Sequence, residues 1–202
     1  DKDNSLTKKI KLEQYRKKKW KNLKWNMGII KDSLTFDDVS LVPQYSSVLP
    51  SEADTFTELS GNVNLQIPLM SSAMDTVTES KMAIEISKLG GIGVIHRNLS
   101  IEKQVMEIKK VKRNNYLVGA AIGVNSKDFE RAEELFKAKT DLIVIDTAHG
   151  HTQKVLNMIS KIKKKIKNCT LCAGNIATGK AARFLADSGV DIVKVGIGPG
   201  SI

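Results

Sequence analysis

Short apolar runs alternate with amphipathic segments along most of this chain, and this alternation limits the possible folds more than any other feature. The runs are rich in β-branched and small residues, which are typical of buried strands. Strands that are apolar on both faces need cover on both sides, so they favour a parallel sheet with helices outside it. The predicted strands are residues 67–74, 91–96, 116–124, 141–148, 170–176 and 191–198.

Amphipathic segments fill the intervals between the predicted strands. Ser100 is the predicted N-cap of one of these helices, and Gly90 and Gly189 follow the ends of two others. The predicted helices are residues 80–90, 99–112, 128–138, 151–166 and 179–189. Strands and helices that alternate in this way form either a doubly wound sheet or a (β/α)₈ barrel.

The residues at the strand ends favour the barrel. Each strand ends in small or functional residues, in the stretches SSAMD, GVIHRN, GAAIGVN, IDTAHGH, AGNIAT and GIGPGS. A barrel builds its site from the ends of many strands, whereas a doubly wound sheet binds ligands at one switch point. We therefore predict an α/β fold, a (β/α)₈ TIM barrel with about six of its eight strands in this chain. The other two strands are expected beyond Ile202.

Positive charge is concentrated at the N-terminus. Residues 1–32 hold 11 Lys and Arg against 4 Asp and Glu, a balance of +7 out of a net charge of +10. We predict a basic N-terminal extension over 1–32 and the barrel domain over 33–202. The extension is interpreted as a solvated, partly helical segment, or as a site for nucleic acid, an anionic surface or a partner subunit. Any nucleic-acid binding would depend on it.

The possible metal and redox motifs are weak. Cys169 and Cys172 form a CxxC pair, but no second pair completes a four-ligand zinc site. The pair enters a strand-like run instead of a helix N-terminus, so we predict buried thiols in a reducing cytosol. His149 and His151 lack a third ligand nearby. No run is long enough to span a membrane and the N-terminus has no secretory signal, which predicts a cytoplasmic protein.

The glycine-rich loop GIGPGS, residues 196–201, is the first candidate binding element. Its glycines would let backbone N–H groups face a phosphate, and Ser201 would add a hydroxyl. Its carbonyls could instead bind a monovalent cation, and a plain tight turn is the third interpretation. The spacing matches neither a P-loop nor a dinucleotide fingerprint.

Polar residues near other strand ends are further candidates. Asp146 could accept hydrogen bonds from a ribose diol or cap the helix that follows. Asn175 could bind a ligand or only shape its loop. Asp75 is interpreted as a helix cap in preference to a ligand contact. Lys194 interrupts an apolar run, so we expect it to face the ligand side of the barrel or to be paired.

Seven motifs together are similar to one known family. They are LTFDDVSLVP, SSAMDTVTE, GGIGVIH, VGAAIGV, IDTAHGH, AGNIAT and VKVGIGPGSI, in this order. They closely resemble inosine-5′-monophosphate dehydrogenase of the bacterial type, from about Leu34 to Ile202. The resemblance implies an NAD-dependent oxidoreductase that converts IMP to XMP in guanine nucleotide biosynthesis. The reaction would pass through a covalent adduct of a cysteine.

The resemblance also assigns individual residues. The nucleophilic cysteine would directly follow Ile202, so this segment alone is expected to be inactive. A potassium ion would be held by carbonyls of Gly198 and Gly200, and a homotetramer is the expected assembly. The residues that match the dinucleotide site are Asp146, Thr147, Ala148, His149, Gly196, Ile197 and Gly198. Those that match the IMP site are Ser72, Met74, Asn175 and Ser201.

The chain departs from the family pattern near residues 113–116. Family members usually insert a pair of regulatory CBS modules at this point, but here the second helix leads directly into the third strand. GMP reductase has the same barrel and a similar loop without CBS modules, and it is the nearest alternative. An alternative of another class is a non-catalytic fragment whose basic extension binds nucleic acid or a partner.

Overall fold

The structure, a computed structural model, describes residues 40–61 and 63–197. The chain divides into two units, Asp1–Leu49 and Pro50–Ile202. In the first unit, residues 40–49 contain no helix or strand. The rest of the first unit, which includes the predicted basic extension over 1–32, lies outside the described residues. The second unit begins with a short 3₁₀ helix, η1 (Pro50–Glu52), and carries the elements described below.

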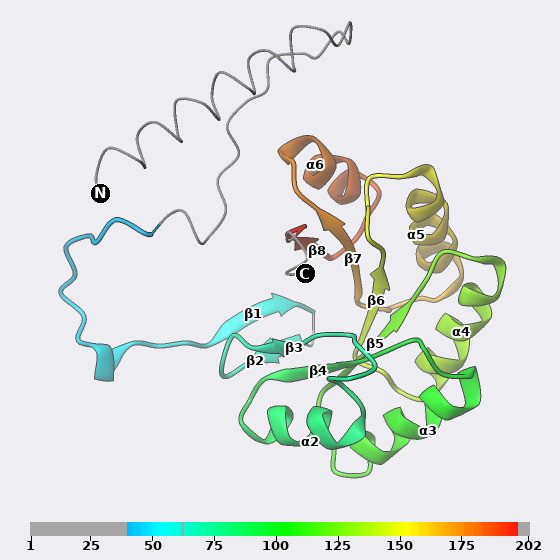
Figure 1. Cartoon of the computed structure of the whole chain (residues 1–202), viewed down its shortest axis with the longest axis horizontal. Coiled ribbons are helices and arrows are strands. Elements are labelled where there is room, and N and C mark those ends of the chain that lie inside the picture. Colours follow the sequence, from blue (N-terminus) through cyan, green and yellow to red (C-terminus); the bar gives the residue numbers. More distant parts are fainter. Residues whose placement is uncertain (1–39, 62, 198–202) are drawn as a thin grey trace, which may run out of the picture. The chain divides into compact units, whose positions relative to one another are not determined.

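A curled, six-stranded parallel sheet forms the centre of the second unit (Figure 1). Its strands are β3 (Met70–Ser71), β4 (Ile92–Ile95), β5 (Val118–Ile122), β6 (Leu142–Asp146), β7 (Leu171–Ile176) and β8 (Ile192–Val195). They are hydrogen-bonded in chain order, each to the next. A doubly wound sheet would instead reverse its order at a switch point. The described strands therefore form part of a TIM barrel, which confirms the predicted fold class.

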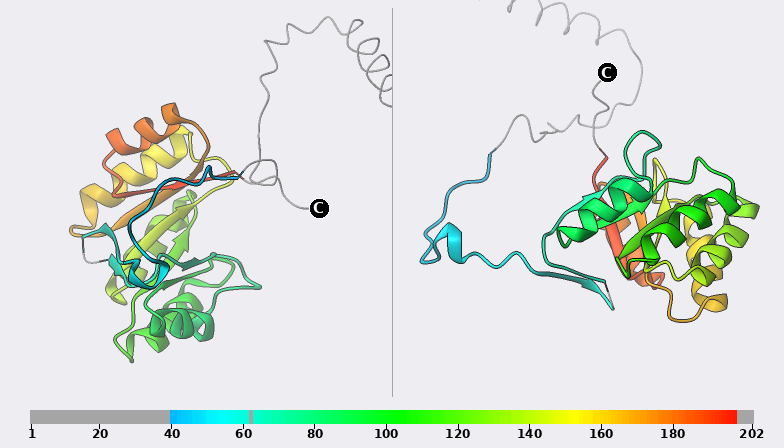
Figure 2. Two further views of the ribbon diagram at one scale, coloured as in Figure 1. Left: turned by 90° about the vertical axis from the view of Figure 1, so that its left-hand side faces the viewer. Right: turned by 90° about the horizontal axis from the view of Figure 1, so that it is seen from below.

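Helices lie along the outer side of the sheet, as two perpendicular views also show (Figure 2). Ser100 caps α3 as predicted, because its Oγ accepts a hydrogen bond from the Lys103 N–H at 3.2 Å. Helix α4 begins two residues earlier than predicted, because Asn125 and Asp128 form a capping box. The helices are α2 (Ser80–Lys88), α3 (Ile101–Lys112), α4 (Ser126–Lys137), α5 (Gln153–Lys165) and α6 (Gly179–Asp187).

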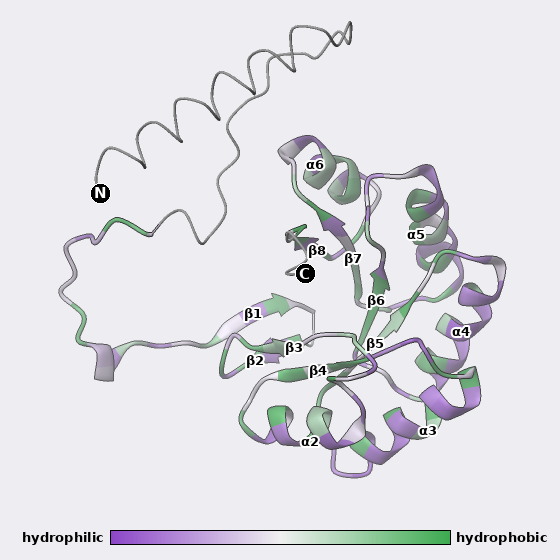
Figure 3. Ribbon diagram, in the orientation of Figure 1, coloured by the Kyte–Doolittle hydropathy of each residue, from purple (hydrophilic) through white to green (hydrophobic). Residues whose placement is uncertain are grey.

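Successive residues of each strand pack into two different apolar layers. Side chains alternate between the faces of a strand, so one set faces the helices and the other faces the inside of the arc. The strands are accordingly mostly apolar, with polar residues such as Asp146 and Lys194 near their C-terminal ends, whereas polar residues gather on the outer faces of the helices (Figure 3). The inner layer contains Ile92, Val94, Ala121, Leu142, Val144 and Cys172. The outer layer includes Ile95, Ala120, Ile122, Ile143, Ile145, Leu171 and Ala173.

An antiparallel hairpin, which the sequence did not predict, adds to the inner layer. Its strands are β1 (Thr57–Ser60) and β2 (Val63–Leu65). Val63 and Leu65 are buried and pack with the inner layer, which includes Ile92 at the start of β4. The hairpin therefore covers the inner layer near the N-terminal ends of the strands. Because β2 has only three residues, its alternation of apolar and polar residues is too short for the sequence to distinguish a strand from a loop.

Both cysteines are free and buried, as predicted. Cys172 lies inside β7, and Cys169 lies just before that strand. Burial raises the pKa of the Cys172 thiol to about 12 and that of Cys169 to about 11. Thiols of this kind are inert at neutral pH. None of the helices in the described ranges is long and apolar enough to cross a membrane.

Candidate functional site at the strand ends

A hollow of about 420 Å³ opens where the C-terminal ends of the strands meet. It is lined from three strand ends: by residues that follow β3, residues that follow β4, and the last residue of β6. Parallel strands bring their carboxyl ends to one face, where barrel enzymes place their active sites. The lining residues are Ala73, Met74, Asp75, His96, Arg97, Asn98 and Asp146.

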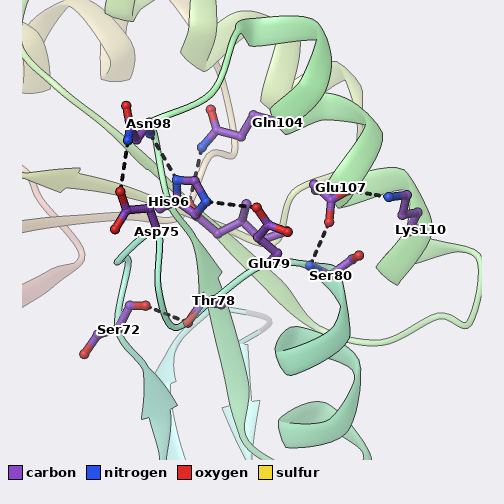
Figure 4. A network of polar contacts seen from close by, with 11 residues as sticks. Ser72, Asp75, Thr78, Glu79, Ser80, His96, Asn98, Gln104, Glu107 and Lys110 are labelled. Carbon is purple, nitrogen blue, oxygen red and sulfur yellow. Dashed lines mark hydrogen bonds and ion pairs between the residues drawn. The ribbon is translucent and has the colours of Figure 1, made fainter.

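The loop between β3 and α2 is tied to the loop after β4 by side-chain hydrogen bonds (Figure 4). Asn98 Nδ2 donates to Asp75 Oδ2 at 3.0 Å. Helix α2 begins only at Ser80 with Glu79 as its N-cap residue, so Asp75 is not the cap. The predicted cap was therefore wrong, because the chain makes four further residues of loop before it turns helical. Asp75 instead fixes the position of the neighbouring loop.

His96 lines this hollow, is almost fully buried and is held by two hydrogen-bond contacts. Its Nδ1 accepts a hydrogen bond from the Asn98 backbone N–H at 3.2 Å. Its Nε2 lies 3.4 Å from Glu79 Oε1. Because Nδ1 is an acceptor, the neutral ring carries its proton on Nε2 and directs it toward Glu79. The ring is thus part of the wall that joins β4 to the start of α2.

Asp146 lies at the end of β6 and forms an ion pair across the sheet. Its Oδ1 is 3.0 Å from Lys194 Nζ on β8. This pair confirms the alternative in which Lys194 is paired, and its orientation toward a ligand stays a prediction. The alternative in which Asp146 caps the following helix is wrong, because Thr152 caps α5 by accepting from the Val155 N–H.

The ends of β6 and β7 are joined by a short network beside this pair. Thr147 Oγ1 donates to the Gly174 carbonyl at 2.7 Å, and the Asn175 N–H donates to the Thr147 carbonyl at 2.8 Å. Asn175 Nδ2 donates to the Gly196 carbonyl at 2.9 Å, which ties β7 to the loop after β8. Asn175 Oδ1 is buried and has no hydrogen-bond partner in the described structure. A buried acceptor without a partner is costly, so this atom is suited to a donor from a bound ligand.

The structure brings some of the predicted site residues together and separates others. Met74 and Asp146 line the same hollow. Ser72 is exposed at the end of β3, and its carbonyl accepts from Thr78 Oγ1 at 2.6 Å. Ala148 and His149 are exposed and are not among the residues that line the hollow. Outside the described residues lie Gly198, Gly200 and Ser201. Gly196 and Ile197 are exposed after β8.

His96, Arg97 and Asn98 line the hollow although sequence reasoning gave them no role. Their signal was the stretch GVIHRN, in which three polar residues directly follow a buried strand. The two histidines of the HxH motif, in contrast, are not part of a group suited to a metal within the described ranges. The His149 and His151 rings lie 6.4 Å apart, and the His151 ring packs edge-on against another ring. No group of three or more His, Cys, Asp or Glu suited to a metal occurs within the described ranges.

A parallel sheet in chain order with its polar site at the strand ends defines a (β/α)-barrel protein. The comparison with known families is more specific: the model described as IMP dehydrogenase / GMP reductase domain matches residues 33–202. The chain therefore belongs to this family, as its seven motifs indicated.

Three curated relatives are each named inosine-5′-monophosphate dehydrogenase. The protein of Borreliella burgdorferi is 45% identical over 86% of this chain and 55% of its own length. That of Cryptosporidium parvum is 42% identical over 84% of the chain and 52% of its length. That of Streptococcus pyogenes is 34% identical over 88% of the chain and 62% of its length. The chain thus spans little more than half the length of the curated relatives it matches.

The alignment with the Streptococcus pyogenes relative contains many positions that face gaps in this chain. Its alignment extends over 306 positions, although this chain has only 202 residues. More than 100 aligned positions therefore have no counterpart here. In this chain α3 leads directly into β5 across residues 113–116. The family resemblance predicts that the pair of CBS modules would be inserted at this point.

Proposed function

We propose that the protein to which this chain belongs oxidises IMP to XMP with NAD⁺. The observation that carries the proposal is the polar hollow at the strand ends, in a chain of the IMP dehydrogenase / GMP reductase family. NAD⁺ supplies the acceptor for a hydride from the purine ring. The nucleophilic cysteine is proposed to follow Ile202 directly, as the family resemblance implies, and to form a covalent adduct with IMP.

The residues at the ends of β6 to β8 are proposed to bind the dinucleotide. Asp146 offers a carboxylate at the edge of the hollow, and carboxylates accept hydrogen bonds from ribose diols in dinucleotide sites. Thr147 is held by its bonds to Gly174, so the backbone next to Asp146 is fixed. Ala148, His149, Gly196, Ile197 and Gly198 are proposed to complete this part of the site.

The proposed IMP site lies beside the dinucleotide site. Asn175 Oδ1 has no partner in the described structure, which favours a hydrogen bond from the nucleotide. Met74 supplies an apolar side chain that is 54% exposed and lines the hollow together with Asp146. Ser72 and Ser201 are the further proposed contacts, with the Ser201 hydroxyl at the IMP phosphate. The carbonyls of Gly198 and Gly200 are proposed to hold a potassium ion, and the assembly is proposed to be a homotetramer; both proposals depend on the family resemblance.

The test is an assay of the intact protein with two substrate pairs. With IMP and NAD⁺ we expect NADH and XMP in equal amounts. Consumption of NADPH with GMP, without oxidation of IMP, would instead identify a GMP reductase. A trapped adduct gives a second readout: mass spectrometry of the protein quenched during turnover is expected to show IMP attached to the cysteine after residue 202. Absence of that cysteine from the intact protein would contradict the proposal.

A further inference from the structure

We propose that Lys194 is a positioning residue that holds the Asp146 carboxylate ready for the dinucleotide. The proposal rests on the proposed function, because it assumes that Asp146 binds the ribose. Lys194 lies on β8 and Asp146 on β6, so β7 separates the two backbones. The Lys194 side chain nevertheless reaches across β7 and places its ammonium 3.0 Å from Asp146 Oδ1.

The crossing depends on a glycine in the intervening strand. Gly174 is the register partner of Asp146 in β6 and also of Lys194 in β8, so the three residues lie in one row across the sheet. Neighbouring strands are about 4.8 Å apart, which puts the outer two backbones roughly 10 Å apart, within the reach of a lysine. A Cβ on Gly174 would lie only 2.5 Å from the carbonyl oxygen of Lys194 and 2.6 Å from the Cβ of Lys194. The row therefore has space for the lysine only because its middle residue has no side chain.

The pair leaves part of the Asp146 carboxylate available to a ligand. Lys194 bonds Oδ1, and Oδ2 has no hydrogen-bond partner in the part of the chain that the structure describes. Asp146 also lines the 420 Å³ hollow. One ammonium thus fixes the carboxylate from the side of β8, while the second oxygen stays open. This is the arrangement that a preorganised acceptor needs, because a ligand then does not have to order the side chain when it binds.

A purely stabilising role fits this pair poorly. The side chains are 38% and 29% exposed, and ion pairs as exposed as these contribute little to folding. Lys163 and Asp191 form a comparable pair with 29% exposure on each side, but Asp191 also accepts from the Leu171 N–H at 2.7 Å. Lys163→Met is therefore a matched control, since it removes a lysine from an aspartate at the opposite end of the same strands.

The experiment measures steady-state kinetics and NAD⁺ binding of the intact protein. We expect Lys194→Met to raise both the KM for NAD⁺ and its Kd by roughly tenfold, the equivalent of about 1.4 kcal/mol. The kcat should stay within about twofold, because the ribose contact is the same in the ground and transition states. Lys194→Arg should restore most of the affinity because it keeps the charge. Lys163→Met should leave both constants unchanged.

Two results would overturn this inference. One is an unchanged KM and Kd in Lys194→Met. The other is a loss of affinity that Lys194→Arg does not rescue and that is accompanied by a lowered thermal midpoint, which would indicate a structural role.

Equilibrium dialysis with NAD⁺ separates the inference from the proposed function. A wild-type protein that binds NAD⁺ but does not oxidise IMP would contradict the proposed function, while the Kd ratio would still decide the role of Lys194. A wild-type protein that does not bind NAD⁺ would contradict both.

Discussion

Lysine–aspartate pairs lie at both ends of the sheet, and the aspartates at the two ends differ in their other hydrogen-bond partners. At the N-terminal end, Asp141 directly precedes β6, pairs with Lys112 at 2.9 Å and accepts from the Val118 N–H at 2.8 Å. Asp191 directly precedes β8 and repeats the arrangement with a lysine from α5 and the first N–H of β7. At the C-terminal end, Asp146 has its lysine but no backbone donor within the described ranges.

The backbone N–H donor distinguishes the aspartates at the N-terminal end from Asp146 and indicates different roles for them. An aspartate that accepts a strand N–H and a lysine connects one strand to the next and to a helix, so it stabilises the sheet. An aspartate with one partner and an open oxygen at the edge of a hollow is suited to a ligand. This division matches the general behaviour of barrels, in which the N-terminal face carries stability and the C-terminal face carries function.

The largest effect is expected from the glycine that the C-terminal pair requires. Gly174→Ala would place a Cβ against the backbone of β8, so the strand must shift and the Asp146–Lys194 row must break. We expect a loss of about 2 to 3 kcal/mol in the free energy of unfolding, together with loss of IMP turnover. Urea denaturation and the NADH assay measure the two effects.

Gly179→Ala is the matched control for this substitution. Gly179 is the first residue of α6, and a Cβ there would have no atom within 4 Å. The control should be neutral or more stable by about 0.5 kcal/mol. An equal loss of stability in both variants would show that the close approach of β8 to Gly174 is unimportant.

A smaller effect on stability is expected at the N-terminal end. Asp141→Ala would leave the Val118 N–H and the Lys112 ammonium without their shared acceptor. We expect a loss of about 2 kcal/mol in the free energy of unfolding, with unchanged KM and kcat below the melting temperature. A variant that keeps its stability but loses NAD⁺ affinity would contradict the division between the two ends.

The inner apolar layer, which contains Cys172, is expected to make the free energy of unfolding fall at alkaline pH. The pKa of the buried Cys172 thiol is raised from 9.0 to about 12, so the unfolded state releases this proton first. The contribution of Cys172 to stability is therefore complete below pH 9 and is lost as the pH rises toward 12. The slope is about 1.4 kcal/mol per pH unit for this thiol. Urea unfolding of wild type and Cys172→Ala between pH 8 and roughly pH 11 should show the difference; parallel curves would mean that water reaches the thiol.

The sequence predicted the architecture well because the fold depends on patterns that are local and repeated. Buried strands such as LIVID and amphipathic helices such as SKDFERAEELFK show their type within one segment. The pairing of Lys194 was also predictable, because a charge inside an apolar strand needs a partner. The partner itself was not, since it depends on a row that crosses three strands.

The parts that the sequence did not predict depend on contacts between distant segments. The β1–β2 hairpin is stabilised by burial of Val63 and Leu65 in the inner layer, which no local pattern reveals. Asp75 was interpreted as a helix cap because α2 follows closely, but its partner Asn98 is 23 residues away. The loop after β4 was missed for the same reason: its polar residues line the hollow only when the C-terminal ends of β3, β4 and β6 meet on one face of the sheet.

The most direct test of the division between the two ends compares Asp146→Ala with Asp141→Ala in the same intact protein. For each variant, kcat/KM for NAD⁺ and the free energy of unfolding are measured together. The account predicts a crossed result. Asp146→Ala should lose roughly 100-fold in kcat/KM, about 2.7 kcal/mol, and keep its stability, whereas Asp141→Ala should lose stability and keep kcat/KM. Parallel losses in both variants, or unchanged NAD⁺ kinetics in Asp146→Ala, would contradict it.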